Sequence, residues 1–436
     1  MKDRVIALVL AATLCLALSA PVALAEGETA GTTPETAAEA SPDAAQPEQA
    51  AADTQEAAPT EEIAAEAAAA EESTAAEPAP AEDAEGTLSF ENIRARMMRN
   101  NYSMLSIQES IDNVEQRDYE WQAESLRKQA NLFGISAAFS EQFESLREQL
   151  KNILKGDAQK DDADTARQYR QAQDLLVVGT ETLYIAVLTL EEQASAMDRS
   201  IAALDRNLAA LHVNQSNGLV SDLSVRTAEN GRTQLISGQE TLQMQAEATL
   251  LNLKAMVGAD LGEPLHLNAL PKVTAAQLNA MDLEPDLAQA MEKSYDLYDA
   301  KKQVTDFRKG TYATAISTYS ESSRNFTFEQ IKHTMQSLIY NEENARQNFE
   351  LKFRTLYAQV QDDAQKLQAA KSALALEEKN YAVAALQYKQ GTISKNALAD
   401  AADKLSDAKD AVSSGERTLF TDYHSYFWAV EYGVMN

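Results

Sequence analysis

Cysteine is nearly absent from this sequence. The chain has 436 residues and one cysteine, Cys15, which lies inside an apolar N-terminal stretch. We expect that stretch to be removed, so disulfide bonds and thiolate chemistry are excluded for the remainder. A lipoprotein signal needs a small residue before its cysteine, and Leu14 precedes Cys15, so lipidation is excluded as well.

The N-terminus has the three parts of an export signal. Lys2 and Arg4 precede an apolar run at 5–18, and Ala23-Leu24-Ala25 forms a small-x-small cleavage site. The pattern predicts a secretory signal peptide over 1–25. An uncleaved anchor is the alternative, and the cleavage site disfavours it. No later stretch reaches eighteen consecutive apolar residues, so we expect no further membrane-spanning helix.

Lysine, arginine and aromatic residues are all missing from residues 26–86. This segment holds 17 acidic residues, with Ile63 as its one large apolar side chain. Such a composition predicts a disordered, extended acidic spacer, either a solvated leader or a tether through a wall. It carries well over half of the net charge of −29, so the remainder is only moderately acidic. A nucleic-acid-binding role is therefore disfavoured.

Glycine and proline are rare, at 15 and 10 residues, and residues 311–390 contain neither. Alanine, leucine, glutamine, lysine and glutamate dominate, and these residues favour helices. A pattern of this length without breakers predicts coiled-coil-like helices. We therefore expect an all-α fold of long antiparallel helical hairpins.

Two segments of the chain repeat each other at an offset of 173 residues. TLYIAV at 182–187 matches TLYAQV at 355–360, Gly218 matches Gly391, and Ser221 matches Ser394. A second match, at an offset of 193, pairs MRNNYSML with MEKSYDLY upstream. Ordered matches of this kind indicate an internal duplication. We assign a first repeat to 87–258, a connector to 259–285 and a second repeat to 286–436.

Each repeat should contain a long helix that turns back at a glycine. The first helix is expected at about 166–215, roughly 75 Å long, with its partner at 223–257. Ser221 or Ser224 could cap that partner, and Ser394 or Asn396 could cap its counterpart in the second repeat. Gly258 should end the partner in a left-handed conformation. The tips of both hairpins are either simple turns or exposed apolar docking points.

The middle of each repeat is its least regular part. Residues 139–154 have apolar residues at intervals of three and four, which predicts an amphipathic helix. Gly156 and the polar run 157–164 should end it. Residues 310–328 are rich in Thr, Ser and Tyr, and their pattern fits either a loop or a weak strand pair.

No set of residues suggests catalysis. The four histidines, His212, His266, His333 and His424, are scattered, without metal-ligand spacing. Carboxylate pairs such as Glu191-Glu192 and Asp362-Asp363 read as solvated helix faces. The aromatic C-terminal run LFTDYHSYFWAVEY is either core or a membrane-interface belt. We expect no enzyme, no cofactor and no metal.

The duplicated glycine turns, the opening LSFENIRARMMRNNYSML and the LNLKAMVG that closes the first repeat resemble the TolC family of outer-membrane efflux proteins. The resemblance covers 87–436. It implies a homotrimer whose helices form a hollow α-barrel in the cell envelope. It also implies a passive conduit that docks a periplasmic adaptor, with an inner-membrane pump supplying the energy. The adaptor-docking tips would be Gly218, Leu219, Val220 and Ser221, and Gly391, Thr392, Ile393 and Ser394.

Two features depart from that family. The family usually has Asp three residues after the tip serine, where this chain has Ser224 and Ala397. The family also inserts two membrane strands in each repeat, and a membrane strand needs about ten alternating residues. Neither middle region has them, so we expect the barrel strands to be missing or vestigial and insertion into an outer membrane to be doubtful. The alternative function is a structural coiled-coil scaffold or spacer of the cell surface.

Overall fold

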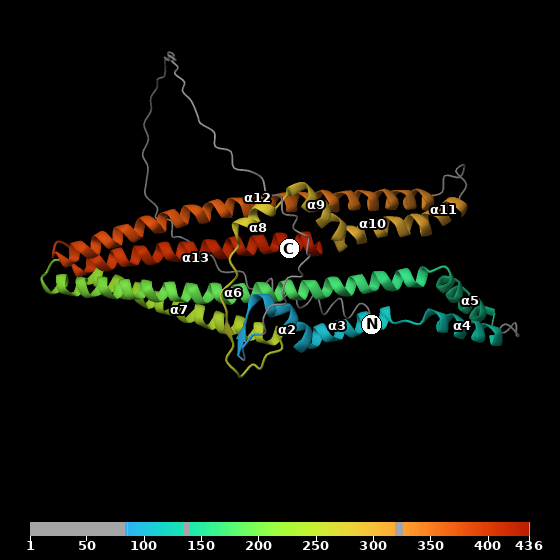
Figure 1. Cartoon of the computed structure of the whole chain (residues 1–436), viewed down its shortest axis with the longest axis horizontal. Helices are drawn as coiled ribbons and strands as arrows, with labels where there is room; N and C mark the ends of the chain where they lie inside the picture. The colour runs from blue at the N-terminus through green and yellow to red at the C-terminus, as the bar shows by residue number, and fades with distance from the viewer. Residues whose placement is uncertain (1–82, 85, 134–139, 319–325, 436) are drawn as a thin grey trace, which may run out of the picture. The chain divides into compact units, whose positions relative to one another are not determined.

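The structure is a computed structural model that describes residues 83–84, 86–133, 140–318 and 326–435 (Figure 1). The predicted signal peptide and nearly all of the acidic spacer lie outside the described residues. Long helices dominate the rest, and the described strands are two residues long each. The predicted all-α fold of long helical hairpins is confirmed.

The first repeat places short helices before one long hairpin. Its strand and helices are β1 (Thr87–Leu88), η1 (Phe90–Asn92), α2 (Ile93–Asn100), α3 (Tyr102–Glu115), α4 (Tyr119–Phe133), α5 (Ser140–Leu154), α6 (Asp157–Ser216) and α7 (Asp222–Met256). Helices α6 and α7 pack along each other, and α3 packs on α6. At 1.5 Å per residue, the 60 residues of α6 span about 90 Å.

The second repeat follows a connector with little regular structure. The connector holds β2 (His266–Leu267) and α8 (Ala275–Ala280), as a loop with short helical pieces should. The second repeat contains α9 (Leu283–Lys293), α10 (Tyr295–Phe307), the π-helical turn η3 (Arg308–Tyr312), α11 (Ala313–Thr318), α12 (Phe326–Lys389) and α13 (Lys395–Tyr432). Helices α12 and α13 form the second long hairpin.

Helix α6 begins nine residues earlier than expected, so the prediction that residues 157–164 interrupt the helices was wrong. Gly156 does end α5, with a left-handed φ of 76°. The acidic run then starts α6, because negative charge is favourable at a helix N-terminus. Neighbouring segments also hold it there: Arg117, in the loop between α3 and α4, pairs with Asp162 at 2.7 Å, and Lys302 of α10 pairs with Asp164 at 3.2 Å.

The middle regions are helical wherever the structure describes them. The amphipathic helix predicted at 139–154 is confirmed as α5, although Phe139 itself lies outside the described residues. The loop or strand pair expected at 310–328 was wrong for the described part, which forms η3 and α11. Ala315 is buried there, and the Tyr312 ring stacks on Phe328 at 6.5 Å. Residues 319–325 lie outside the described residues.

A short parallel strand pair ties the start of the first repeat to the connector. Thr87 lies opposite His266 and Leu88 opposite Leu267. The buried Tyr184 of α6 closes this junction, because its hydroxyl lies 2.6 Å from the Asn268 carbonyl oxygen and 3.0 Å from that of Leu88. Strands of two residues leave no periodic pattern, so the sequence could not reveal them.

Both repeats close in the same way, at a glycine after their last helix. Gly258 and Gly433 have left-handed φ values of 65° and 68°. An added Cβ on Gly258 would lie 2.5 Å from the Asn100 carbonyl oxygen, and one on Gly433 would overlap the backbone of Lys293 and Ser294. Each glycine therefore packs against the break between two short helices at the start of its own repeat.

The same break is capped in both repeats, which strengthens the case for duplication. The Asn101 side chain starts α3 by accepting hydrogen bonds from the Ser103 and Met104 backbone amides, and its Nδ2 donates to the Met256 carbonyl at 2.6 Å. Ser294, 193 residues later, starts α10 by accepting from the Leu297 amide. Both caps are buried. The offset found in the sequence thus matches an equivalent junction in space.

One described helix, α6, is long and apolar enough to cross a membrane by length and composition alone. Half of its most apolar window is buried inside the protein. Val177, Tyr184 and Val187 lie in this part of the helix and are almost fully buried. The sequence after the signal peptide has no unbroken run of eighteen apolar residues, which is why no such helix was expected. In α6 it is the mean hydropathy over part of the helix that is high.

Candidate docking tips

The first hairpin turns at residues 213–225, here called tip 1. Helix α6 ends in a Schellman motif: the Gly218 amide donates to the Gln215 carbonyl and the Leu219 amide donates to the Asn214 carbonyl, both at 2.9 Å. Gly218 has a φ of 74°, which an L-residue rarely adopts. The glycine therefore lets the chain leave α6 with its last carbonyls satisfied.

The second hairpin turns at residues 386–398, here called tip 2, with the same hydrogen bonds. The Gly391 amide donates to the Tyr388 carbonyl at 2.9 Å, and the Thr392 amide donates to the Gln387 carbonyl at 3.0 Å. Gly391 has a φ of 73°. The 173-residue offset thus describes two turns of the same geometry.

Serine caps restart the chain as a helix at both tips. The Ser221 hydroxyl accepts from the Ser224 amide at 3.2 Å, and the Ser394 hydroxyl accepts from the Ala397 amide at 3.1 Å. Ser221 and Ser394, the first of the two candidates offered for each cap, are therefore the capping residues. The missing Asp three residues on does not disturb the turns, because the cap uses a backbone amide there.

Exposed apolar side chains surround the turns. Leu219 is 75% exposed at the apex of tip 1, and its neighbours Val213 and Leu223 are also exposed. Leu386 and Tyr388 are exposed at tip 2. Val220 and Ile393 are half-buried, and Thr392 is exposed. The eight residues proposed for docking lie at the two turns, and the exposed apolar residues that flank them were not predicted.

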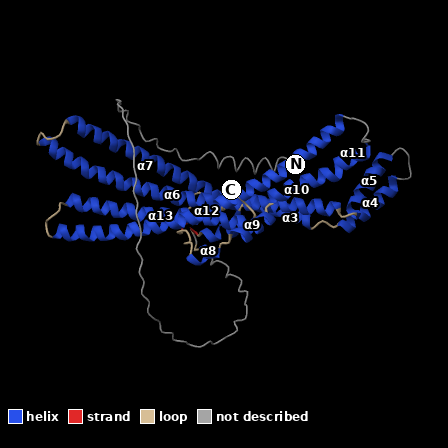
Figure 2. Cartoon of the chain, turned by 90° about the horizontal axis from the view of Figure 1, so that it is seen from above, coloured by secondary structure: helices blue, strands red, loops and turns tan. Residues whose placement is uncertain are grey.

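Both tips lie at the same end of the paired hairpins, as the two views agree (Figure 2). Three arginine–carboxylate pairs join α6 to α13: Glu192 with Arg417, Arg199 with Asp410, and Arg206 with Asp403. Successive pairs are seven residues apart on each helix, and the residue numbers increase along α6 while they decrease along α13. We call this set the interhelical ladder, and its antiparallel order brings the end of α6 beside the start of α13.

The ladder corrects one interpretation of the sequence. Glu192 was expected on a solvated face, but it pairs with Arg417 between the hairpins. Charges spaced by seven on both helices were the available signal, because a heptad step returns to one helix side. Recognising the partner helix required the fold.

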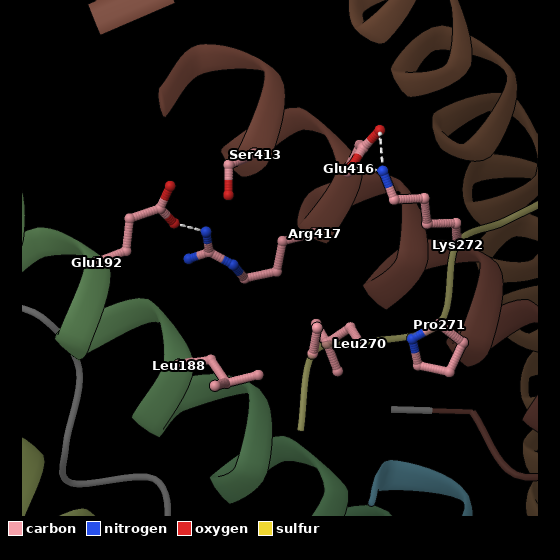
Figure 3. Close-up of a pocket in the computed structure, with 9 residues that line it drawn as sticks. Leu188, Glu192, Leu270, Pro271, Lys272, Ser413, Glu416 and Arg417 are labelled. Carbon is pink, nitrogen blue, oxygen red and sulfur yellow. Dashed lines mark hydrogen bonds and ion pairs between the residues drawn. The ribbon is translucent and has the colours of Figure 1, made fainter. Parts of the chain in front are cut away.

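A cavity of about 330 Å³ lies beside the ladder, between α6, α13 and the connector (Figure 3). The charged side chains at its wall point toward each other in pairs. Arg417 pairs with Glu192, and Lys272 lies 2.9 Å from a Glu416 carboxylate oxygen. Leu188, Leu270 and Pro271 supply apolar walls. The cavity thus offers paired charges rather than a reactive group.

A buried carboxylate nearer the start of α6 joins the two repeats. Glu181 is 7% exposed and accepts hydrogen bonds from Trp428 Nε1 at 2.8 Å, with His424 Nε2 also at 2.8 Å. The His424 ring stacks on Phe420 at 5.5 Å and meets Phe90 edge-on at 4.8 Å. His424 is a packing residue, and the aromatic C-terminal run supplies core here. Among the described residues, no group of three His, Cys, Asp or Glu side chains could hold a metal ion.

The carboxyl groups of Asp363 and Asp422 meet inside the second hairpin, where the prediction for Asp363 was wrong. Asp363 was expected on a solvated face, but it is 8% exposed. Burial raises the pKa of Asp422 from 3.8 to about 6, helped by a hydrogen bond to Asp363 and by its charge, while Lys366 opposes the shift. The proton on Asp422 is therefore held more tightly in the folded chain than in the unfolded one.

This pair predicts a pH dependence of stability. The pKa of Asp422 is raised in the folded chain, so protonation of Asp422 stabilises the fold. This contribution to the free energy of unfolding is complete below the unfolded pKa of 3.8 and is lost as pH rises through about 6. Between pH 5 and 7 the free energy of unfolding should fall by about 1 kcal/mol from this group, and by less if water reaches it. Asp422→Asn should remove that fall, as measured by urea unfolding at pH 5, 6 and 7.

The control for this experiment is Asp407→Asn, which removes an exposed carboxylate on α13 that forms no ion pair with a described residue. It should keep the pH dependence of the unaltered protein. A pH profile of Asp422→Asn that matches the unaltered protein would show that the Asp363–Asp422 pair does not share a proton.

No protein-family model and no curated protein matches the chain. Several solved structures are similar to it. The outer-membrane channel OprN is 12% identical at a TM-score of 0.49, with 79% of this chain and 91% of that chain covered. The MtrE outer-membrane channel of Neisseria gonorrhoeae is 13% identical at 0.44, with 79% and 89% covered. The outer-membrane protein VceC of Vibrio cholerae is 13% identical at 0.42, with 79% and 95% covered. All three are outer-membrane proteins by name.

Proposed function

We propose that this chain is the protomer of a TolC-like export duct in the cell envelope, which docks a periplasmic adaptor through its two tips. The duct is passive, and an inner-membrane pump supplies the energy. The observation that carries the proposal is the pair of duplicated turns, at Gly218 and Gly391, at one end of the hairpins. A spacer needs long helices, but it does not need two equivalent tips with exposed apolar residues.

Exposed apolar residues along the hairpins support assembly into a homotrimer. Met244 and Leu251 are exposed on α7, and Leu376 and Val383 are exposed on α12. Each pair is separated by seven residues, so its members lie on one side of the helix. Repeated exposure of large apolar side chains marks surfaces that contact another chain. Neighbouring copies packed through α7 and α12 would enclose a lumen.

The proposal does not require membrane strands. The described residues of both middle regions form α4, α5, η3 and α11 at the end away from the tips (Figure 1). A helical end of this kind is compatible with a duct that stops at an outer layer instead of crossing it. Localisation to the envelope rests on the predicted signal peptide.

Electron microscopy of residues 26–436, purified without detergent, tests this function. We expect soluble hollow trimers with a tapering end, and light scattering should give the mass of three chains. A solid dimer or an elongated monomer would overturn the duct and favour a structural coiled-coil scaffold. Hollow trimers that need detergent would keep the duct but contradict the membrane-free end.

A further inference from the structure

The two tips share a backbone conformation but carry opposite charge. Tip 1 contains one charged residue, Asp222, whereas tip 2 contains two, Lys389 and Lys395. Asp222 and Lys395 occupy the same position, the first residue of the helix after the capping serine. The duplication therefore kept the turns and reversed the charge at their apices.

The charge of tip 1 is balanced locally, and that of tip 2 is not. Asp222 pairs with Arg226 at 2.7 Å and accepts a hydrogen bond from the Gln215 side-chain Nε2 at 3.2 Å. Lys389 and Lys395 are exposed and form no ion pair with any described residue. The next carboxylates along α13 are Asp400, more than a turn away, and Asp403, which already pairs with Arg206.

Lys395 also opposes the local preference of its helix. The first turn of α13 contains no acidic residue, while the first turn of α7 contains Asp222. A cation at a helix N-terminus is unfavourable because it meets the positive end of the helix dipole. Residues that break a local rule at an exposed place are expected where function outweighs stability.

Apolar residues accompany the charges at both tips. Leu386 and Tyr388 precede Lys389 on α12, and Leu219 and Leu223 flank Asp222 at tip 1. A surface that mixes apolar side chains with exposed charge fits a protein partner, because protein interfaces combine an apolar centre with a polar rim. A uniformly anionic membrane surface fits less well, because it would meet Asp222 at tip 1.

From this asymmetry we propose that tip 2 docks an acidic segment of the partner protein. Glutamate or aspartate side chains of that segment face Lys389 and Lys395, and apolar side chains of the partner contact the leucines of tip 1. This inference rests on the docking role proposed above and adds the chemistry of the partner. It predicts that adaptors without carboxylates at the docking end are rejected, since unmatched charge at an interface selects against a partner.

The test uses residues 26–436 and a synthetic helical peptide with leucines on one face and glutamates on the other. Fluorescence anisotropy measures its binding to the unaltered chain, to Lys389→Glu/Lys395→Glu, and to the control Lys379→Glu/Lys404→Glu. Lys379 and Lys404 lie on the same hairpin, are exposed and form no ion pair with a described residue. We expect about tenfold weaker binding for the tip variant alone, since two attractive pairs become repulsive.

Three further measurements locate the interaction. Carbodiimide should cross-link the peptide carboxylates to Lys389 and Lys395, as identified by mass spectrometry. A peptide with glutamine in place of glutamate should bind about tenfold more weakly than the acidic one. Circular dichroism should give the same helical content for all variants, so that a loss of binding reports the tip and not the fold.

Several results would overturn the inference. Equal weakening by both double variants would indicate nonspecific attraction to lysine, and no weakening would remove Lys389 and Lys395 from the site. Vesicles of phosphatidylcholine and phosphatidylglycerol that bind through these lysines, when the peptide does not, would identify a lipid surface instead. The peptide assay does not depend on the oligomeric state. Failure of the duct in electron microscopy and failure of the acidic partner are therefore separate outcomes.

Discussion

Alanine at Gly258 or Gly433 should lower the free energy of unfolding by roughly 2–5 kcal/mol. Both glycines have left-handed φ values, which cost an L-residue about 1–2 kcal/mol. Both also pack where a Cβ would overlap the backbone of another helix. Backbone cannot rotate away as a side chain can, so the helix junction must open, and overpacking adds about 1–3 kcal/mol or more.

Gly218 and Gly391 provide the matched controls. Their φ values of 74° and 73° are equally left-handed, but a Cβ on either would meet no atom within 4 Å. Alanine at these turns should therefore cost only about 1–2 kcal/mol. Urea unfolding of the four single variants separates the two causes. Equal losses in all four would mean that backbone conformation alone sets the cost and that the helix junctions do not resist the added methyl group.

The features that the sequence predicted are local ones. A glycine in the C′ position and a serine three residues later act on the backbone beside them, so Gly218 with Ser221 and Gly391 with Ser394 located both turns. The amphipathic pattern of α5 is likewise local. The start of α6 was misplaced because the same aspartates that avoid helix interiors are favourable in a first turn.

The features that the sequence missed depend on partners far along the chain. Asp363 has the composition of a surface residue, and only the packing of α13 against α12 buries it against Asp422. The ladder depends on α6 meeting α13, some 200 residues later. Periodicity gives the face of a helix that is polar, but it does not give the helix that the face meets. The opposite charges of the tips can be read from the sequence, but the structure was needed to show that Asp222 and Lys395 occupy the same position in two equivalent turns.

Phe353→Ala should destabilise the second repeat far more than the first. Phe353 is fully buried in α12, with its ring 5.2 Å from that of Tyr426. It belongs to a core cluster whose buried members all come from residues 281–429, on α9, α12, α13 and the residues just before α9. Removing a buried phenylalanine costs about 3–5 kcal/mol through lost transfer energy and the cavity left behind.

Hydrogen exchange can locate that loss within the chain. Because the cluster contains no residue of α6 or α7, protection should fall along α9, α12 and α13 and change much less along the first hairpin. Leu351→Ala is the control, since Leu351 lies two residues away on α12 and is 65% exposed, so it should cost under about 0.5 kcal/mol. An equal loss of protection in both hairpins would mean that the ladder and the Glu181 contacts couple the repeats into one cooperative unit. In that case the duplicated halves fold together, and each tip is positioned by the core of the other repeat as well as by its own.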